Sequence, residues 1–182
     1  IDEAVDNGAK VIVTPGYKFS DAMQEKQSQY PDVKFIMIDA TPSGDKIESN
    51  VYAALYAEQE PGYLAGYAAV KDGYTKLGFM GGMKLPAVIR FGYGFIQGAS
   101  DAAKEMNVQV EIKYNYTGSF NESPEIKTLS SAWYQDGTEV IFACGGSICL
   151  SVFSAAQEAN AKSIGVDSDQ KDASETVITS AM

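Results

Sequence analysis

The chain has 182 residues, and a chain of this length buries roughly two-thirds of the surface that it exposes when unfolded. Hydrophobic residues make up 45% and charged residues 21% of it, which is typical of a folded globular protein. The formal net charge of −10 repels a phosphate backbone, so we do not expect the chain to bind nucleic acid.

Histidine is absent from the sequence. Its absence excludes Ser-His-Asp and Cys-His catalytic relays and every His-ligated metal site. Cys144 and Cys149 are too few for a four-thiolate zinc site or a disulfide framework. They could pair only if the backbone folded back between them, and we expect two buried, unpaired thiols instead. We therefore predict no metal and no cofactor.

The first nine residues look like the end of a helix. Ile1, Val5 and Ala9 are four residues apart, and the Asn7-Gly8 pair stops the helix before a strand-like run. We expect the chain to be a fragment, and no targeting segment can be identified in it.

Apolar runs and helical stretches alternate along the rest of the chain. Strands are predicted over residues 11–13, 33–38, 77–80, 108–114, 140–143 and 164–166. Helices are predicted over residues 21–30, 58–71, 91–106, 124–135 and 147–160. This alternation indicates an α/β protein with parallel strands, and the nearly continuous apolar strands favour sheets covered by helices on both faces.

The segment over residues 140–157 carries no charge and resembles a membrane span. It is shorter than the roughly 20 residues that a bilayer requires, and Gly145-Gly146-Ser147 interrupts it. We therefore interpret it as a buried strand followed by a helix that Ser147 caps.

Each predicted strand ends in glycine or a small polar residue. Because ligands bind beyond the carboxyl ends of parallel strands, we expect these turns to line one cleft. They offer aromatic rings, carboxylates, hydroxyls and glycine amides but almost no positive charge, which suits a flat, neutral, hydroxyl-rich molecule. The six turns are residues 15–17, 39–41, 81–83, 117–120, 144–146 and 167–169.

Familiar nucleotide and catalytic motifs are missing. The sequence has no P-loop, and residues 78–82 do not form a dinucleotide-binding turn. Residues 145–149 lack the closing glycine of a nucleophile elbow. Residues 167–172 begin like a calcium loop, but Lys171 occupies a ligand position and Asp172 replaces the turn glycine.

A set of motifs in order along the chain resembles the basic membrane protein family, the PnrA-like substrate-binding lipoproteins of ABC transporters for purine nucleosides. The motifs are Tyr-Pro-Asp-Val at 30–33, Gln-Glu-Pro-Gly-Tyr-Leu-Ala-Gly at 59–66, Gly-Phe-Met-Gly-Gly-Met at 78–83, Tyr-Thr-Gly-Ser-Phe at 116–120 and Gly-Val-Asp-Ser-Asp-Gln at 165–170. The resemblance covers essentially the whole chain.

The resemblance implies a type I periplasmic-binding fold, in which two αβα lobes close on a ligand. On that template residues 1–73 belong to an incomplete N-terminal lobe and residues 74–182 form most of the C-terminal lobe, with hinges near Gly73-Tyr74 and after Asp169. It further implies a purine nucleoside ligand such as guanosine, inosine or adenosine, an ABC permease as partner, and no enzymatic activity. An extracytoplasmic location follows as well, with a lipid anchor that lies outside this segment.

The resemblance favours Asp167 as the carboxylate that accepts hydrogen bonds from two ribose hydroxyls, with a helix N-cap or a surface turn acid as the alternative. Asp39 also ends a strand and is either a ligand-binding or a turn acid. Phe91, Tyr17 and Phe120 are the candidates for stacking on a purine. Core packing is the alternative for Phe91, which is four residues from Phe95.

Two glycines complete the set of predicted ligand-binding residues. Gly82 and Gly145 make tight turns and could also let a ligand approach the backbone closely. Two other functions fit the same residues: a cytoplasmic ligand-sensing regulatory domain, and an enzyme acting on a sugar or nucleoside.

Overall fold

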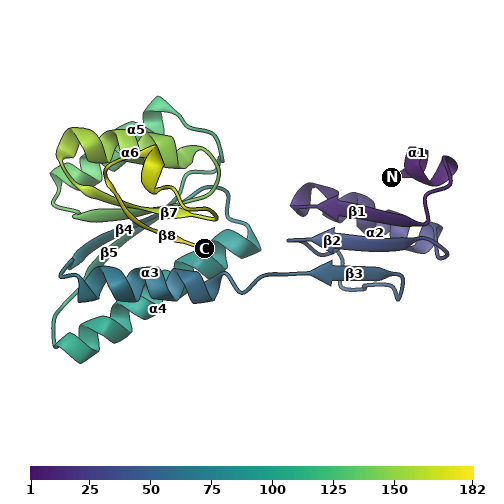
Figure 1. Ribbon diagram of the computed structural model, residues 1–182, viewed down its shortest axis with the longest axis horizontal. Coiled ribbons are helices and arrows are strands. Elements are labelled where there is room, and N and C mark those ends of the chain that lie inside the picture. Colours follow the sequence, from purple (N-terminus) through teal and green to yellow (C-terminus); the bar gives the residue numbers. More distant parts are fainter. The chain divides into compact units, whose positions relative to one another are not determined.

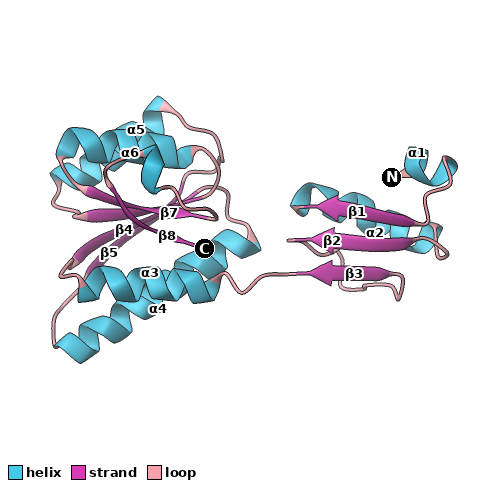
Figure 2. Ribbon diagram, viewed as in Figure 1, coloured by secondary structure: helices cyan, strands magenta, loops and turns pink.

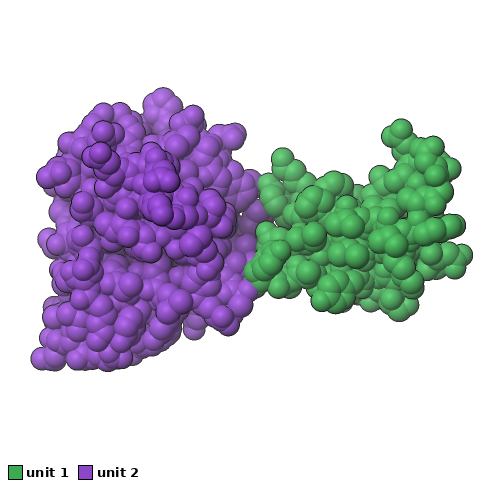
Figure 3. All heavy atoms as spheres, viewed as in Figure 1, with its two compact units in different colours: residues 1–56 green, residues 57–182 purple.

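The strands form two separate sheets in the computed structural model, which describes residues 1–182 (Figure 1). One sheet has the strand order β1-β2-β3 and the other β5-β4-β6-β7-β8, and every pairing is parallel, as predicted. The sheets belong to two compact units, residues 1–56 and 57–182 (Figure 3). The six strand-end turns therefore divide between the two sheets, because two follow strands of the first sheet and four follow strands of the second.

The first unit contains three strands and two α-helices. In chain order these are α1 (Asp2–Asp6), β1 (Val11–Pro15), the 3-10 turn η1 (Tyr17–Phe19), α2 (Ser20–Gln29), β2 (Lys34–Ile38) and β3 (Val51–Ala54).

Only one face of this first sheet is covered within the unit. Phe35 and Met37 of β2 are buried and pack with Met23 of α2. Residues on the opposite face are exposed, among them Val11 at 57% and Tyr52 at 68%. Coverage of both faces, as predicted, is therefore not found in this unit.

The second unit alternates strands and helices. It contains α3 (Gln59–Lys71), β4 (Lys76–Gly81), α4 (Pro86–Met106), β5 (Glu111–Tyr116), α5 (Pro124–Gln135), β6 (Val140–Cys144), α6 (Ile148–Ala159), β7 (Lys162–Val166), the 3-10 turn η2 (Lys171–Ala173) and β8 (Val177–Ala181).

Both faces of the second sheet are covered, as predicted (Figure 2). Phe142 of β6 faces the core formed with α3 and α4, whereas its neighbour Ile141 faces the core formed with α5 and α6. The alternation follows from the two-residue period of a strand. Because every residue of β6 is buried, this central strand is apolar throughout.

Helices α3 and α4 are packed backbone to backbone. A Cβ atom on Gly66 would lie 2.1 Å from the carbonyl oxygen of Phe95, and one on Gly98 would lie 2.0 Å from that of Tyr63. Gly62 and Gly94 make equally close approaches across the same crossing. This packing places α3 in the second compact unit, which begins at Ala57, and the lobe boundary after residue 73 stays a prediction. Gly73 and Tyr74 lie inside the second unit.

Several element bounds differ from the prediction for identifiable reasons. Strands β3 and β8 were not predicted, because each is an edge strand with few fully buried residues. Helix α4 begins at Pro86 rather than residue 91, since proline is favoured in the first turn of a helix.

The predicted buried, unpaired state of Cys144 and Cys149 is confirmed. No helix has the length and apolar character required for a membrane span.

Candidate functional site

Three of the strand-end turns in the second unit are linked by backbone hydrogen bonds. Gly82 N donates to Cys144 O at 2.9 Å, which joins the turns after β4 and β6. Thr117 N donates to Gly81 O at 2.8 Å, which joins the turns after β4 and β5. The turns predicted from the sequence therefore form one continuous surface at the carboxyl ends of β5, β4 and β6.

The ring of Phe120 lies across two of the predicted glycines. A Cβ atom on Gly82 would lie 2.4 Å from Phe120 Cδ1, and one on Gly145 would lie 2.7 Å from Phe120 Cε1. Ser147 N fixes the same turn by donating to Phe120 O at 2.8 Å. The close approach expected at these glycines is thus made by Phe120, which is half-buried.

Ser147 takes part in this surface as well. Its backbone precedes α6 at the predicted cap position, but its hydroxyl makes no cap bond to that helix. Instead Ser147 Oγ accepts from Glu122 N at 3.0 Å and donates to Phe120 O at 3.2 Å. The residue therefore stabilises the Phe120 turn rather than the helix.

Asp167 follows β7 and adopts a left-handed backbone conformation, with φ of 67°. Its N–H donates to Ala181 O at 3.0 Å, and Ser168 N donates to Val166 O at 2.8 Å. Non-glycine residues rarely adopt this conformation, and Asp and Asn tolerate it best. The structure does not place Asp167 at a helix N-terminus, since η2 begins only at Lys171. Its side chain is exposed.

The surroundings of Asp167 raise the pKa of its carboxyl above the ordinary value for aspartate. Although its surface is accessible, partial burial raises the pKa of the carboxyl, and the negative charge of Glu58 raises it further. Asp167 and Glu58 in turn add to the effect of burial in raising the pKa of Cys144. These three residues therefore share one acidic region near the ends of β6 and β7.

Glu58 forms a bidentate ion pair that the sequence did not predict. Arg90 Nε lies 2.5 Å from Glu58 Oε2, and Arg90 Nη2 lies 3.0 Å from Glu58 Oε1. The carboxylate is 6% exposed and sits immediately before α3, while Arg90 lies in the second turn of α4. No short-range pattern signals a pair separated by 32 residues. The pair holds the start of α3 against α4 beside Asp167.

In the first unit the other two strand-end candidates lie on neighbouring strands. Tyr17 follows β1 and is 36% exposed, and Asp39 follows β2. Gly16 N donates to Ile38 O at 2.7 Å and so joins the two turns. Gly16 has φ of 84°, a conformation that favours glycine. The structure therefore brings Tyr17 and Asp39 to the same edge of the first sheet.

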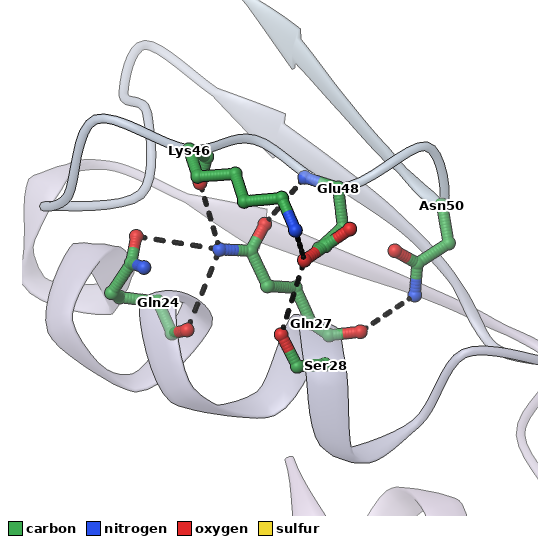
Figure 4. A network of polar contacts seen from close by, with 6 residues as sticks. All are labelled: Gln24, Gln27, Ser28, Lys46, Glu48 and Asn50. Atoms are coloured by element: carbon green, nitrogen blue, oxygen red, sulfur yellow. Dashed lines mark hydrogen bonds and ion pairs between the residues drawn. The ribbon is translucent and has the colours of Figure 1, made fainter.

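A buried amide holds the loop that follows Asp39 (Figure 4). Gln27 of α2 is 1% exposed; its Nε2 donates to Lys46 O at 3.0 Å, and its Oε1 accepts from Glu48 N at 2.9 Å. Asn50 at the end of the loop donates to Gln27 O at 3.1 Å and to Tyr30 O at 3.0 Å. The loop is thus fixed by side chains rather than by strand pairing, which sequence patterns do not reveal.

Phe91 lies in the core of the second unit. It is 7% exposed and packs edge-on against Phe142, with ring centroids 6.1 Å apart. Phe95, four residues on, is fully buried against the same ring. This arrangement matches the core-packing alternative, so Phe91 is not part of the exposed strand-end surface. Tyr134 of α5 is likewise buried, and its hydroxyl donates to Lys162 O at 2.8 Å.

A separate groove of about 420 Å³ lies between α3 and α4. Its lining residues, among them Tyr63, Leu64 and Tyr93, include none of the predicted site residues. No group of three or more acidic or cysteine side chains is arranged to hold a metal ion.

The family model Bmp, described as "ABC transporter substrate-binding protein PnrA-like", matches residues 1–182. The chain is 32% identical over 179 residues to the "ABC transporter nucleoside-binding protein BmpA" of Lactococcus lactis subsp. cremoris, a match that covers 93% of this chain and 49% of that protein. The chain spans about half the length of the curated relatives that it matches.

Solved structures show the same fold. An ABC transporter solute-binding protein from Aeropyrum pernix K1 superposes with a TM-score of 0.83 at 28% identity, covering 98% of this chain and 52% of that one. A transcriptional activator of the comK gene from Bacillus halodurans superposes with a TM-score of 0.77 at 25% identity, covering 98% of this chain and 60% of that one. The predicted periplasmic-binding type of α/β fold is confirmed.

Proposed function

We propose that this chain, which belongs to the Bmp family of PnrA-like ABC transporter substrate-binding proteins, is part of a protein that binds a purine nucleoside without transforming it. The observation that supports the proposal most is the exposed Asp167 carboxylate, held at the end of β7 in a conformation that costs energy. Strained residues persist where the surrounding structure fixes them, and they concentrate at functional sites.

Asp167 is suited to a ribose. A carboxylate has two oxygens and can accept hydrogen bonds from two neighbouring hydroxyls, and such charge-assisted bonds are stronger than neutral ones. The charge of Glu58 acts on this carboxylate, and the nearby cations Arg90 and Lys171 are already paired with Glu58 and Asp169, which disfavours a phosphate. A nucleoside therefore fits this region better than a nucleotide.

The remaining candidates are assigned to the rest of the ligand. Phe120, which is partly exposed at a strand end of the second unit, would contact the flat base, and Tyr17 and Asp39 are the ligand-binding candidates at the strand ends of the first unit. Gly82 and Gly145 would act indirectly, because their lack of a Cβ atom leaves the space that the Phe120 ring occupies. Phe91 would support this surface from the core.

The proposal extends to the cellular role. As a substrate-binding protein, the complete gene product would be extracytoplasmic, attached by a lipid anchor, and would deliver its ligand to an ABC permease. Neither a general acid nor a general base is needed for this task, in keeping with the missing histidine.

Isothermal titration of the complete gene product with guanosine, inosine, adenosine and ribose tests the proposal, with the Lactococcus lactis BmpA as positive control. We expect a nucleoside to bind at least about tenfold more tightly than ribose, since a stacked base contributes roughly 1 to 3 kcal/mol. Recovery of the unchanged nucleoside by chromatography would support binding without turnover. Equal affinity for ribose and guanosine, or no affinity for either, would overturn the proposal.

A ligand-sensing regulator is the second candidate, because the comK activator shares the fold. Cell fractionation distinguishes the two functions: a transport component is released with the extracytoplasmic or membrane fraction, whereas a regulator stays with the cytoplasm and its DNA.

A further inference from the structure

The side chain of Gln170 folds back onto the strand that precedes it. Its Oε1 accepts from Val166 N at 3.0 Å, and its Nε2 donates to Cys149 Sγ on α6 at 3.7 Å. Its backbone N–H donates to Ser180 Oγ on β8 at 3.0 Å. A single residue thus connects the turn after β7 to three separate elements.

The bond to Val166 replaces a missing strand contact. The pairing of β6 with β7 ends at Phe142 and Ile164, two residues before the end of β7. Val166 is 2% exposed, so an unpaired N–H there would carry the full desolvation penalty of a buried donor. Gln170 supplies the acceptor that β6 does not provide.

Gly165 leaves the space that this arrangement requires. A Cβ atom at Gly165 would lie 2.4 Å from Gln170 Oε1 and 2.8 Å from Ser180 Oγ. Any larger residue would push the Gln170 amide away from Val166. The absence of a side chain at Gly165 therefore makes room for both neighbours, Gln170 and Ser180.

Asp167 lies between these two anchored positions, one residue after Val166 and three before Gln170. Its left-handed conformation, with φ of 67°, has to be maintained by its neighbours. We propose that Gln170 is a positioning residue that fixes the Asp167 carboxylate and so determines selectivity for a ligand with ribose hydroxyls. This inference rests on the proposed function, because it deepens the role given to Asp167.

Gln170→Met tests the inference in the complete gene product, since methionine retains the length of glutamine but neither accepts from Val166 nor donates to Cys149. We expect guanosine to bind about tenfold more weakly, whereas 2′-deoxyguanosine changes by less than about threefold. The selectivity between the two nucleosides falls accordingly. Gln157→Met, an exposed substitution on α6, is the matched control and should leave both affinities unchanged.

A double-mutant cycle separates positioning from general destabilisation. When Asp167→Asn is already present, adding Gln170→Met should weaken guanosine binding by less than about twofold, because the carboxylate it positions is gone. Additive losses, or unchanged selectivity in Gln170→Met, would overturn the inference. If Gln170→Met does not fold, Ser180→Ala, which removes only the contact to Gln170 N, is expected to reduce the same selectivity.

Hydrogen exchange distinguishes failure of the inference from failure of the proposed function. We expect amide exchange in residues 165–170 to be faster in ligand-free Gln170→Met than in the unmodified protein. If the unmodified protein bound no nucleoside, only the proposed function would fail while the exchange result stood. Unchanged exchange in a protein that binds guanosine would contradict the positioning role itself.

Discussion

Asp39 and Asp167 occupy equivalent positions in two different parallel sheets. Each is the first residue after a central strand, and each has a positive φ, 59° and 67° respectively. Asp39 N donates to Ala54 O at 2.8 Å, and Asp167 N donates to Ala181 O at 3.0 Å. In both cases the acceptor is the last residue of the next strand along the chain. The two acids therefore project from the same local backbone arrangement.

The equivalence extends to the strands around them. In the first unit the order is β1, α2, β2, a loop and β3, and in the second it is β6, α6, β7, a loop and β8. In each, the strand that carries the acid lies between the other two and pairs in parallel with both. Each unit thus presents one carboxylate beyond its strand ends, where parallel sheets bind ligands.

The equivalent positions of Asp39 and Asp167 lead to a first prediction. Asp167→Asn should weaken guanosine binding by about tenfold or more, because asparagine tolerates the left-handed conformation but loses the charge-assisted bonds. Asp39→Asn should weaken binding in the same direction. Isothermal titration measures both, and Asp32→Asn, at an exposed turn of the first unit, is the control. A wild-type affinity in Asp167→Asn would contradict the role of the carboxylate.

Much of this architecture could be predicted from the sequence, since helix α5 and the apolar strands have strong periodic patterns. The edge strands β3 and β8 could not be, because partial exposure removes the apolar signal. The division into two compact units could not be predicted either, for a different reason. Which unit α3 joins depends on glycines in two helices approaching each other, and this contact is tertiary.

The candidate site, like the fold, could be predicted from the sequence only in part. The sequence located Asp167, Asp39 and Tyr17 at strand ends, because that position follows from local pattern alone. Phe91 illustrates the limit, since a helical spacing of four fits both a core stripe and a ligand contact. The Glu58–Arg90 pair and the Gln170 contacts depend on long-range geometry, and no spacing rule identifies them.

The raised pKa of Asp167 predicts a dependence of binding on pH. Burial and Glu58 raise this pKa above its ordinary value, so the carboxylate is protonated at a higher pH than an exposed aspartate. Guanosine affinity should therefore fall as the pH is lowered from about 7 towards about 4.5. Titrations across this range in the unmodified protein and in Asp167→Asn, whose profile should be flatter, test the expectation.

The stability of the folded protein should change with pH in the opposite direction from guanosine affinity, because of the raised pKa of Asp167. A carboxyl whose pKa is raised by folding stabilises the folded state most when it is protonated, and that contribution is lost as the pH rises through the folded pKa. Asp167→Asn should accordingly be at least as stable as the unmodified protein near neutral pH. Thermal unfolding followed by circular dichroism measures the difference, and a marked loss of stability would contradict the assignment.

The close packing of α3 and α4 predicts large effects from small substitutions. Gly66→Ala and Gly98→Ala place a methyl group about 2 Å from a backbone carbonyl, which cannot move without separating the helices. Each should lower the free energy of unfolding by about 1 to 3 kcal/mol or more. Chemical denaturation measures this, with Lys104→Ala on the exposed side of α4 as control. Alanine otherwise favours a helix over glycine, so a stabilised variant would show that the helices are further apart.

Gln27 predicts a link between a buried amide and the loop that follows Asp39. Gln27→Leu leaves Lys46 O and Glu48 N without their partner, and should cost about 1 to 3 kcal/mol of stability. Because the loop over residues 40–50 is then held less firmly, its amides should exchange faster than in the unmodified protein. The amides of β4 in the second unit should not change. Gln29→Leu, at an exposed position of the same helix, is the matched control and should change neither quantity. Equal exchange in the two variants would mean that the loop is held by its remaining contacts, such as the bond from Ser43 N to Ser20 O.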